Sequence, residues 1–398
     1  MALSVLVFGQ SGYNQLQPPT TTVPASFFGM HIHRAGAATA WPAVPVPEWR
    51  LWDAHAVWPD VEPTRGQWNF DGLDKYVSLA SQHNTDILLP LGLSPRWASA
   101  RSQEPSTYQP GFAAEPADIE DWRTYVRTVA TRYKGRIHAY EIWNEPNLKQ
   151  FWTGTTDQMV VLVREASQII RGIEPHAIIV SPSATSTGGT KWLAEFLKKG
   201  GGQYVDVIGY HFYVNPQAPE AQIPLIQQVK QIMADNDAGS KPLWNTETGW
   251  MSPKPFPSEE LGAAYLARAC ILNWAAGVQR FYWYAWDNHG VMSIETTQPD
   301  NQALRPAGLA YATIQKWLVG ARLDSCSKNS SGTWTCQLNR TAALQWIVWN
   351  ERGSRSFGVP TSWHATTVDP LLQDSYQFYG PTLDIGESPV LVRSLVSN

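Results

Sequence analysis

The chain has 398 residues with 43% hydrophobic content, enough for one large barrel or two to three ordinary domains. Only 16% of the residues are charged, and the formal net charge is −4 with no basic run, which argues against nucleic acid and anionic membranes as partners. No stretch of about 18 or more consecutive apolar residues predicts a membrane span. Tryptophan is in excess, with 20 residues, and without a basic patch these flat rings favour stacking on sugars over bases.

The first 25 residues form an N-terminal lead-in. Residues 1–10 are mostly apolar and precede Ser-Gly, which resembles the end of the apolar part of a signal peptide, although no basic segment precedes them. We therefore expect residues 1–25 to include the remnant of a signal peptide and the protein to be secreted or periplasmic. The alternative is an ordinary N-terminal tail.

From residue 26, strand and helix signals alternate along the chain. Periodicity and turn residues predict strands at 27–33, 48–52, 86–92, 137–143, 177–181, 205–210, 242–246 and 279–286. Helices are predicted at 71–84, 117–133, 156–172, 191–199, 223–236, 258–276 and 307–318. The Pro-rich segment 41–47 is too short for a regular crossover helix, so the first connection should lack one.

Eight strands with helices between most of them predict an α/β protein whose catalytic domain, residues 26–320, is a TIM (β/α)8 barrel. The rival fold is a doubly wound open sheet. That fold would need a Gly-rich turn of the GxGxxG type after the first strand, and the sequence has none there.

The remaining residues, 321–398, form a β-rich accessory domain. Short strands are predicted at 334–338, 343–349, 356–359 and 389–395, with polar turns between them. This pattern predicts a small β-sandwich or β-sheet domain packed on the barrel, which could share strands with residues 11–25. Asn329 and Asn339 begin N-glycosylation motifs, which matter only if the source is eukaryotic.

The three cysteines do not have the spacing of a zinc site. Cys326 and Cys336 flank a Gly-containing turn, so we expect a disulfide across a hairpin; the alternative is two thiols in a reducing cell. Cys270 lies in an apolar helical run and is expected to be a small buried side chain.

Two glutamates stand at predicted strand ends. The fourth strand stops at Asn144-Glu145-Pro146, because proline cannot continue the ladder, and Glu247 ends the seventh strand. In an eight-stranded ring the fourth and seventh strands are three positions apart, so the two carboxylates should face each other across the barrel mouth. A carboxylate pair about 5–5.5 Å apart retains configuration in glycoside hydrolysis, whereas about 6.5–9.5 Å gives inversion.

Two motifs carry a resemblance to a known family. Glu-Ile-Trp-Asn-Glu-Pro-Asn at 141–147 and Trp-Asn-Thr-Glu-Thr-Gly-Trp at 244–250 resemble retaining glycoside hydrolases with catalytic glutamates on strands 4 and 7. The sequence is most similar to glycoside hydrolase family 39, which includes β-xylosidases, α-L-iduronidases and exopolysaccharide endoglycosidases. The resemblance covers roughly residues 26–320.

The resemblance implies roles for several residues. Glu145 would be the general acid/base, Glu247 the nucleophile, and Asn144 would hold the sugar 2-OH. Arg50, a rare charge in an apolar strand, would stabilise the nucleophile; the alternative is an unrelated ion pair. Tyr213, which follows the sixth strand, would hydrogen-bond the nucleophile.

Histidines and tryptophans near strand ends are further candidates for substrate binding. His31 and His33 share one face of the first strand, and one of them could contact a substrate hydroxyl; His211 ends the sixth strand. For each the alternative is a buried ring with satisfied partners. Among the tryptophans, Trp286 is the expected sugar platform, and three more are candidates for further subsites or for the core, namely Trp97, Trp152 and Trp250.

These features together predict a retaining β-glycoside hydrolase that acts on an oligo- or polysaccharide by double displacement, without a cofactor or metal. Asp53 and His55 follow the second strand, but no third metal ligand stands at a fitting spacing. Long loops and many tryptophans favour endo action. Two alternatives remain: a non-catalytic carbohydrate-binding barrel, which would be expected to lack one carboxylate, and a lyase or isomerase, which would need a metal or phosphate site.

Overall fold

A computed structural model describes residues 15–251, 256–300, 302–340 and 343–394. The expected signal-peptide remnant in residues 1–10 lies outside these ranges, as does the last residue of the strand predicted at 389–395. None of the helices within them is both long enough and apolar enough to cross a bilayer.

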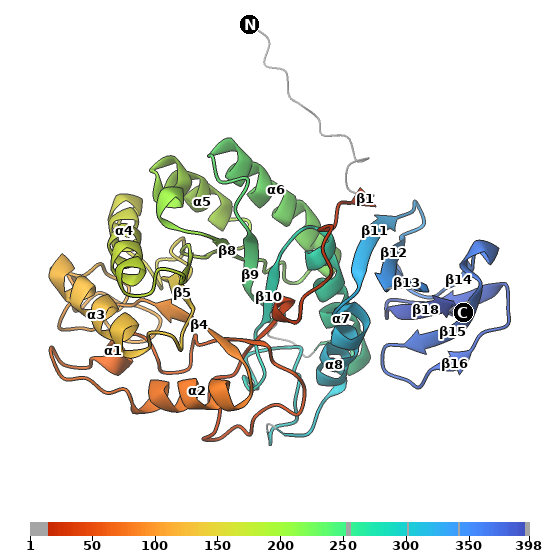
Figure 1. Ribbon diagram of the computed structural model, residues 1–398, viewed down its shortest axis with the longest axis horizontal. Coiled ribbons are helices and arrows are strands. Elements are labelled where there is room, and N and C mark those ends of the chain that lie inside the picture. Colours follow the sequence, from red (N-terminus) through yellow and green to blue (C-terminus); the bar gives the residue numbers. More distant parts are fainter. Residues whose placement is uncertain (1–14, 252–255, 301, 341–342, 395–398) are drawn as a thin grey trace, which may run out of the picture.

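A parallel sheet curls into a barrel at the centre of the larger half of the molecule (Figure 1). Pairing of β10 with β2 joins the last strand to the first. The gap between β6 and β8 is closed by a bridge between Val180 and Val207. The predicted TIM barrel is thus confirmed, and its strands are β2 (Phe28–His31), β3 (Glu48–Arg50), β4 (Asp86–Leu91), β5 (Ala139–Ile142), β6 (Ile178–Val180), the short β7 (Ala184–Thr185), β8 (Ile208–His211), β9 (Leu243–Thr248) and β10 (Arg280–Trp283).

Helices surround the strands (Figure 1). Several begin where the sequence places a capping residue: the side chains of Asp118, Thr155 and Ser258 each accept a hydrogen bond from the first turn. As predicted, the connection from β2 to β3 has no helix, whereas the one-turn α1 was not expected. The helices are α1 (Trp58–Val61), α2 (Asp71–Gln82), α3 (Ile119–Arg132), α4 (Thr156–Ile173), α5 (Gly189–Lys198), α6 (Gln222–Asp235), α7 (Glu259–Ala275) and α8 (Pro306–Leu318).

The barrel strands alternate between an outer core against the helices and an inner layer. Ile87 and Leu89 of β4 belong to the large core cluster, whereas Leu88 between them packs in a separate cluster. That inner cluster consists of Leu88, Ala139, Val180, Val207, Trp244 and Tyr282. The same alternation puts Trp49 in the outer core and turns its neighbours Glu48 and Arg50 into the barrel. The barrel interior is therefore filled by side chains, with charged groups among them.

The C-terminal part is an antiparallel sheet in the order β1-β11-β12-β13-β18-β15-β16, with a two-stranded ribbon, β14 and β17, beside it. β1 pairs with β11, so the lead-in does share a strand with this sheet. Strands β11, β15, β16 and β17 were not among the predicted strands, and β15 and β17 lie in segments with few large apolar residues. The strands are β1 (Gln15–Leu16), β11 (Arg322–Lys328), β12 (Thr333–Arg340), β13 (Ala343–Asn350), β14 (Arg355–Gly358), β15 (Ala365–Pro370), β16 (Tyr376–Gln377), β17 (Thr382–Ile385) and β18 (Val390–Ser394).

Both faces of this sheet are covered. In β13, Trp346 and Val348 pack with Leu383 of the ribbon, while Ile347 and Trp349 belong to the core shared with the barrel. Period-two alternation therefore makes β13 a strand that joins two cores.

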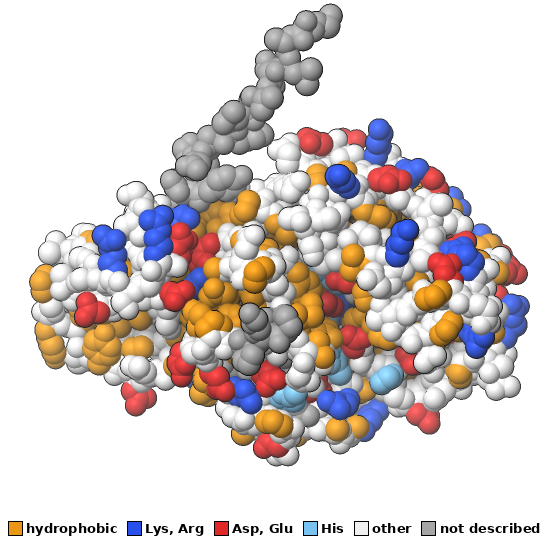
Figure 2. All heavy atoms as spheres, turned by 180° about the vertical axis from the view of Figure 1, so that it is seen from behind, with side chains coloured by type: hydrophobic (Ala, Val, Ile, Leu, Met, Phe, Trp, Pro, Cys, Tyr) orange, Lys and Arg blue, Asp and Glu red, His pale blue; other side chains and the backbone are white. Residues whose placement is uncertain are grey.

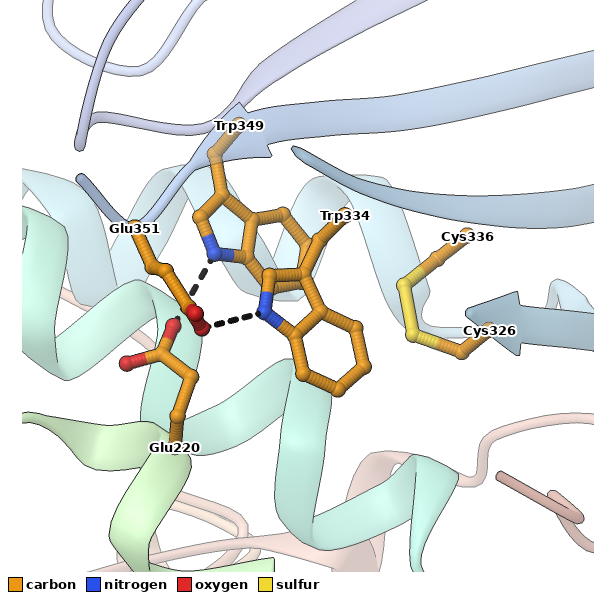
Figure 3. The surroundings of a disulfide bond; sticks show 6 residues. All are labelled: Glu220, Cys326, Trp334, Cys336, Trp349 and Glu351. Carbon is orange, nitrogen blue, oxygen red and sulfur yellow. Dashed lines mark hydrogen bonds between the residues drawn. A yellow bond between two sulfur atoms is a disulfide. The ribbon is translucent and has the colours of Figure 1, made fainter. Parts of the chain in front are cut away.

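A polar contact fixes the sheet to the barrel (Figure 3). Trp349 Nε1 donates to Glu220 at 3.0 Å, and Arg268 holds the other oxygen of Glu220 at 2.7 Å. In the same sheet, a disulfide joins Cys326 and Cys336, which are directly opposite each other on β11 and β12.

On the face turned away in Figure 1, basic and acidic side chains of the described residues are interspersed (Figure 2). The barrel half of this face has a hollow in which acidic side chains are visible, next to a group of hydrophobic side chains.

Candidate active site

Glu145 reaches the barrel mouth through an unusual backbone. Trp143 and Glu145, just after β5, have φ angles of 70° and 45°, a left-handed region that non-glycine residues rarely adopt. Backbone bonds hold the turn: Trp143 donates to Leu91 at 2.7 Å and Glu145 donates to Ser183 at 2.9 Å. Such conformations persist where the surroundings enforce them, often at functional sites.

Glu145 and Glu247 converge at the mouth. One oxygen of each carboxylate and one nitrogen of His211 all lie within 4.8 Å of one another. Both glutamates are buried, at 8% and 7% exposure. His211 Nδ1 lies 2.9 Å from Glu145 Oε1 and 3.9 Å from Glu247 Oε1, so the imidazole stands between the two acids.

Arg50 lies beneath this pair and hydrogen-bonds to several of the site residues. The guanidinium is fully buried and donates to Glu141 at 2.5 Å, to Glu247 at 2.8 Å and to Asn144 Oδ1 at 2.8 Å. A planar guanidinium suits this task because its donors point in fixed directions. Arg50 therefore fixes three acceptors from two strands at once.

Glu141 is a site residue that sequence reasoning missed. This fully buried carboxylate also accepts hydrogen bonds from Ser183 Oγ and from Thr246 Oγ1, the latter at 2.8 Å. The signal was present, since residues 139, 141 and 143 share one face of a strand, and an inward charge in a barrel strand needs a buried partner.

Glu247 is bound on both oxygens. Arg50 donates to Oε2, and the Tyr213 hydroxyl donates to Oε1 at 3.0 Å. Burial raises the pKa of Glu247 to about 7; His211 and Arg50 lower it, and the carboxylate of Glu145 raises it. Burial likewise raises the pKa of Tyr213, which stays a hydroxyl donor.

The chemistry of this cluster fits a metal ion poorly. Glu145, His211 and Glu247 could each offer one ligand atom. However, both oxygens of Glu247 already accept hydrogen bonds, and the Arg50 guanidinium at 2.8 Å would repel a cation.

The two N-terminal histidines lie at different depths. His31 is fully buried and donates through Nε2 to Thr246 O at 3.1 Å; burial lowers its pKa well below the usual value, and Arg50 lowers it further. Its Nδ1 is buried and has no partner among the described residues. His33 lies at the wall of a pocket of about 330 Å³, with Nδ1 3.5 Å from Asp287 and Nε2 without a partner among the described residues.

Asp53 is a second residue that sequence reasoning did not assign to the site. Its carboxylate accepts hydrogen bonds from the hydroxyls of Tyr108 at 2.5 Å and Tyr284 at 2.6 Å. Asp53 is close enough to Glu247 to raise that residue's pKa. These two hydrogen bonds connect the segments after β3, β4 and β10 on the Glu247 side of the mouth.

The tryptophans expected to bind sugars are largely occupied by packing. Trp286, Trp250 and Trp152 are 1%, 2% and 3% exposed, so the structure does not present them as open sugar platforms. Trp250 stacks on Trp283, and Trp152 packs edge-on against Trp143. Trp97 is half-buried, with its Nε1 bound to Glu62 O and the Arg65 guanidinium over its ring. Exposure of a tryptophan depends on tertiary packing, which the sequence pattern does not reveal.

A groove of about 980 Å³ opens beside Glu145. The segments after β7 and β8 and one face of α6 form its walls, and Glu145 and Tyr213 stand in its lining.

Comparison with known proteins gives concordant results. Residues 49–285 match the sequence model of a family described as glycosyl hydrolases family 39. A β-xylosidase from Geobacillus stearothermophilus is 24% identical over 229 residues, 50% of this chain and 45% of that protein. A β-xylosidase from Caldicellulosiruptor saccharolyticus is 27% identical over 160 residues, 36% of this chain and 33% of that protein. The matched part thus spans less than half the length of these two relatives.

Among solved structures, a family 39 glycoside hydrolase from Bacteroides cellulosilyticus superposes with a TM-score of 0.75 at 17% identity, covering 94% of this chain and 81% of that one. At this identity the likeness concerns the fold.

Proposed function

The chain belongs to glycosyl hydrolase family 39, and from that premise we propose that it is a retaining β-glycosidase in which Glu247 is the nucleophile and Glu145 the general acid/base. The observation that carries the proposal is the distance between the carboxylates. One oxygen of each lies within 4.8 Å of the other. So close an approach favours the retaining class, whose carboxyl groups are about 5–5.5 Å apart, over the inverting class, whose carboxyl groups are about 6.5–9.5 Å apart.

The hydrogen bonds around the two acids support this division of roles. Arg50 and Tyr213 donate to Glu247, and both contacts stabilise the ionised form that a nucleophile needs. Glu145 Oε2 makes no hydrogen bond within the described part of the chain, and Glu145 lines the open groove. A carboxyl with one free oxygen beside open space is suited to give a proton to a leaving group.

The first step forms a covalent intermediate. A carboxylate oxygen of Glu247 attacks the anomeric carbon as the glycosidic C–O bond breaks, and the leaving oxygen takes the proton of Glu145. In the second step Glu145 takes a proton from water, the water oxygen attacks the anomeric carbon, and the bond to Glu247 breaks. Asn144, held through Oδ1 by Arg50, keeps its amide NH₂ available for the sugar 2-OH.

The names of the relatives suggest the first substrate to test. Two relatives are named β-xylosidases, so β-xylosides are the starting point. The test is proton NMR of the first product released from 4-nitrophenyl β-xyloside, with β-glucoside, β-galactoside and α-arabinofuranoside in parallel. We expect the sugar to be released with the anomeric configuration of the substrate. Release of the opposite anomer would overturn the retaining assignment.

A further inference from the structure

The groove beside Glu145 extends well beyond the reacting atoms. The anomeric carbon must lie within reach of Glu247, and the leaving oxygen must lie at Glu145. Glu145 and Tyr213, the hydroxyl partner of Glu247, line the groove, whereas Glu247 itself does not, so the space extends from the acid/base along α6. Whatever fills it is attached to the leaving oxygen.

Amide side chains line one wall. Pro224, Gln227, Gln228 and Gln231 are spaced three, four and seven residues along α6 and therefore share one face, about 10 Å long at 1.5 Å per residue. The side chains of Gln227 and Gln228 form no hydrogen bonds with any described residue. Asn215 on the facing segment has a buried Oδ1 that also lacks a partner there. Amides that donate and accept are suited to sugar hydroxyls.

The rest of the described lining combines apolar side chains with uncharged polar ones such as Thr185, Ser186 and Gln217. Leu148, Val214, Leu225 and Met251 contribute apolar surface, which suits the C–H faces of sugar rings. Apart from Glu145, the described lining residues carry no charge. A chain of uronic acids or sulfated sugars would find no cation to pair with among the described lining residues, at a cost in desolvation.

We propose that this groove binds the leaving-group side of the substrate and that the substrate is a neutral oligosaccharide with more than one sugar unit beyond the cleaved bond. The inference rests on the proposed function, because it takes Glu145 as the acid/base. The volume supports it: about 980 Å³ is at the upper end of the roughly 300–1,000 Å³ of sites that hold whole drug-sized ligands, more than a single sugar fills.

The binding experiment uses isothermal titration calorimetry on the full-length Glu247→Ala variant, which holds ligands without turnover. Xylotetraose and cellotetraose are the neutral probes, and tetragalacturonate is the charged probe of equal length. We expect at least one neutral probe to bind more tightly than tetragalacturonate. The substitution Gln228→Trp, which fills the groove, should weaken the binding of that neutral probe about tenfold. The control is Gln82→Trp, the same change at an exposed glutamine in α2.

A kinetic readout separates this proposal from the proposed function. In the chain with Glu247 intact, Gln228→Trp should lower kcat/KM for xylotetraose at least about fivefold more than for 4-nitrophenyl β-xyloside. Equal effects on both substrates, equal binding by both Trp variants, or no binding of either neutral probe would overturn the groove proposal. A fully active Glu247→Ala enzyme would instead overturn the proposed function, and the kinetic comparison of the two substrates would still report on the groove.

Discussion

Two buried clusters of glutamate and arginine lie inside the same barrel, at opposite ends. At the C-terminal mouth Arg50 binds Glu141 and Glu247. At the N-terminal end Glu48, which begins β3, accepts a hydrogen bond from Arg280 at 2.7 Å and lies 3.2 Å from the hydroxyl of Tyr282. Both clusters consist of inward-facing strand residues, so their chemistry is alike and their surroundings differ.

The difference is in charge balance and access. The lower cluster places one carboxyl group beside one guanidinium, whereas the upper one holds Glu141, Glu247 and nearby Glu145 around Arg50 and His211. Burial raises the pKa of Glu247, and the nearby charge of Glu145 raises it further, so this group of carboxylates is costly to bury. Stability alone does not explain such an arrangement, whereas chemistry with carboxylates does. If the mouth is catalytic and the opposite end only supports the fold, substitutions at the two ends should differ strongly in their effect on activity.

The largest effect is expected from Glu247→Ala. Removal of the nucleophile should lower kcat by about 10⁴-fold or more on every substrate, since the covalent intermediate cannot form. Added azide can occupy the vacated space, and the product should then be an α-glycosyl azide, identified by NMR. An unchanged kcat would refute the role of Glu247.

A slightly smaller effect, which depends on the leaving group, is expected from Glu145→Ala. Loss of the acid should slow cleavage of xylobiose by about 10²–10⁴-fold. The formation step with 2,4-dinitrophenyl β-xyloside should be nearly unaffected, because that phenolate leaves without a proton. The stopped-flow burst of 2,4-dinitrophenolate and the steady-state kcat/KM for xylobiose measure this contrast; equal losses on both would contradict an acid role.

Tyr213→Phe should reduce kcat/KM by about 10- to 100-fold, since a hydrogen bond to a charged group is worth about 1.5–3 kcal/mol. The sign of the pH effect follows from the geometry. Tyr213 donates to Glu247 Oε1 and stabilises the ionised form, so its loss raises the pKa of Glu247 above about 7. The acidic limb of kcat/KM should move up by about one pH unit. A purely structural tyrosine would lower activity without moving that limb.

Glu141→Gln should move the same limb the other way. Without the Glu141 charge, Arg50 is less neutralised and lowers the pKa of Glu247, so the limb should shift to lower pH. We expect only a several-fold loss of kcat, with a lower melting temperature from the altered buried pair. Opposite shifts of the acidic limb in the Tyr213 and Glu141 variants would show that both residues act through the pKa of Glu247. Shifts in the same direction would exclude this shared action on Glu247.

The sequence predicted the parts of this comparison that depend on local pattern. The eight strands followed from apolar runs between turn signals, and the positions of Glu145 and Glu247 followed from strand ends that Pro146 and the strand count mark. The convergence of the two carboxylates then follows from barrel closure, which is a property of the fold.

The sequence could not predict what depends on partners distant in the chain. Asp53 is held at the site by hydrogen bonds from Tyr108 and Tyr284, which are 55 and 231 residues away in the chain. The buried position of Trp286 likewise depends on the neighbours that cover its ring. Long-range packing decides both, so neither composition nor periodicity carries the information.

The smallest effect on activity is expected from Glu48→Gln, the matched change at the other end of the barrel. Glu48 lies two residues from Arg50 on the same strand, yet faces the N-terminal end, where side chains of TIM barrels serve stability. We expect kcat/KM to stay within about twofold of the native value. A hundredfold loss of kcat/KM would mean that the two ends of the barrel are coupled. The distinction between a catalytic end and a supporting end would then not hold.

Glu48→Gln should change the pH dependence of stability even though it leaves activity nearly unchanged. Burial raises the pKa of Glu48 to about 8, although Arg280 lowers it. The folded chain therefore keeps this proton up to about pH 8, whereas the unfolded chain releases it near pH 4.5, so the native protein loses stability as pH rises between these values. The amide that replaces Glu48 in the Glu48→Gln variant cannot titrate, so the free energy of unfolding, from urea denaturation at pH 5 and pH 8, should fall less in the variant, by on the order of a few kcal/mol. An equal fall in both proteins would mean that Arg280 keeps Glu48 ionised, and the lower cluster would then be a simple ion pair.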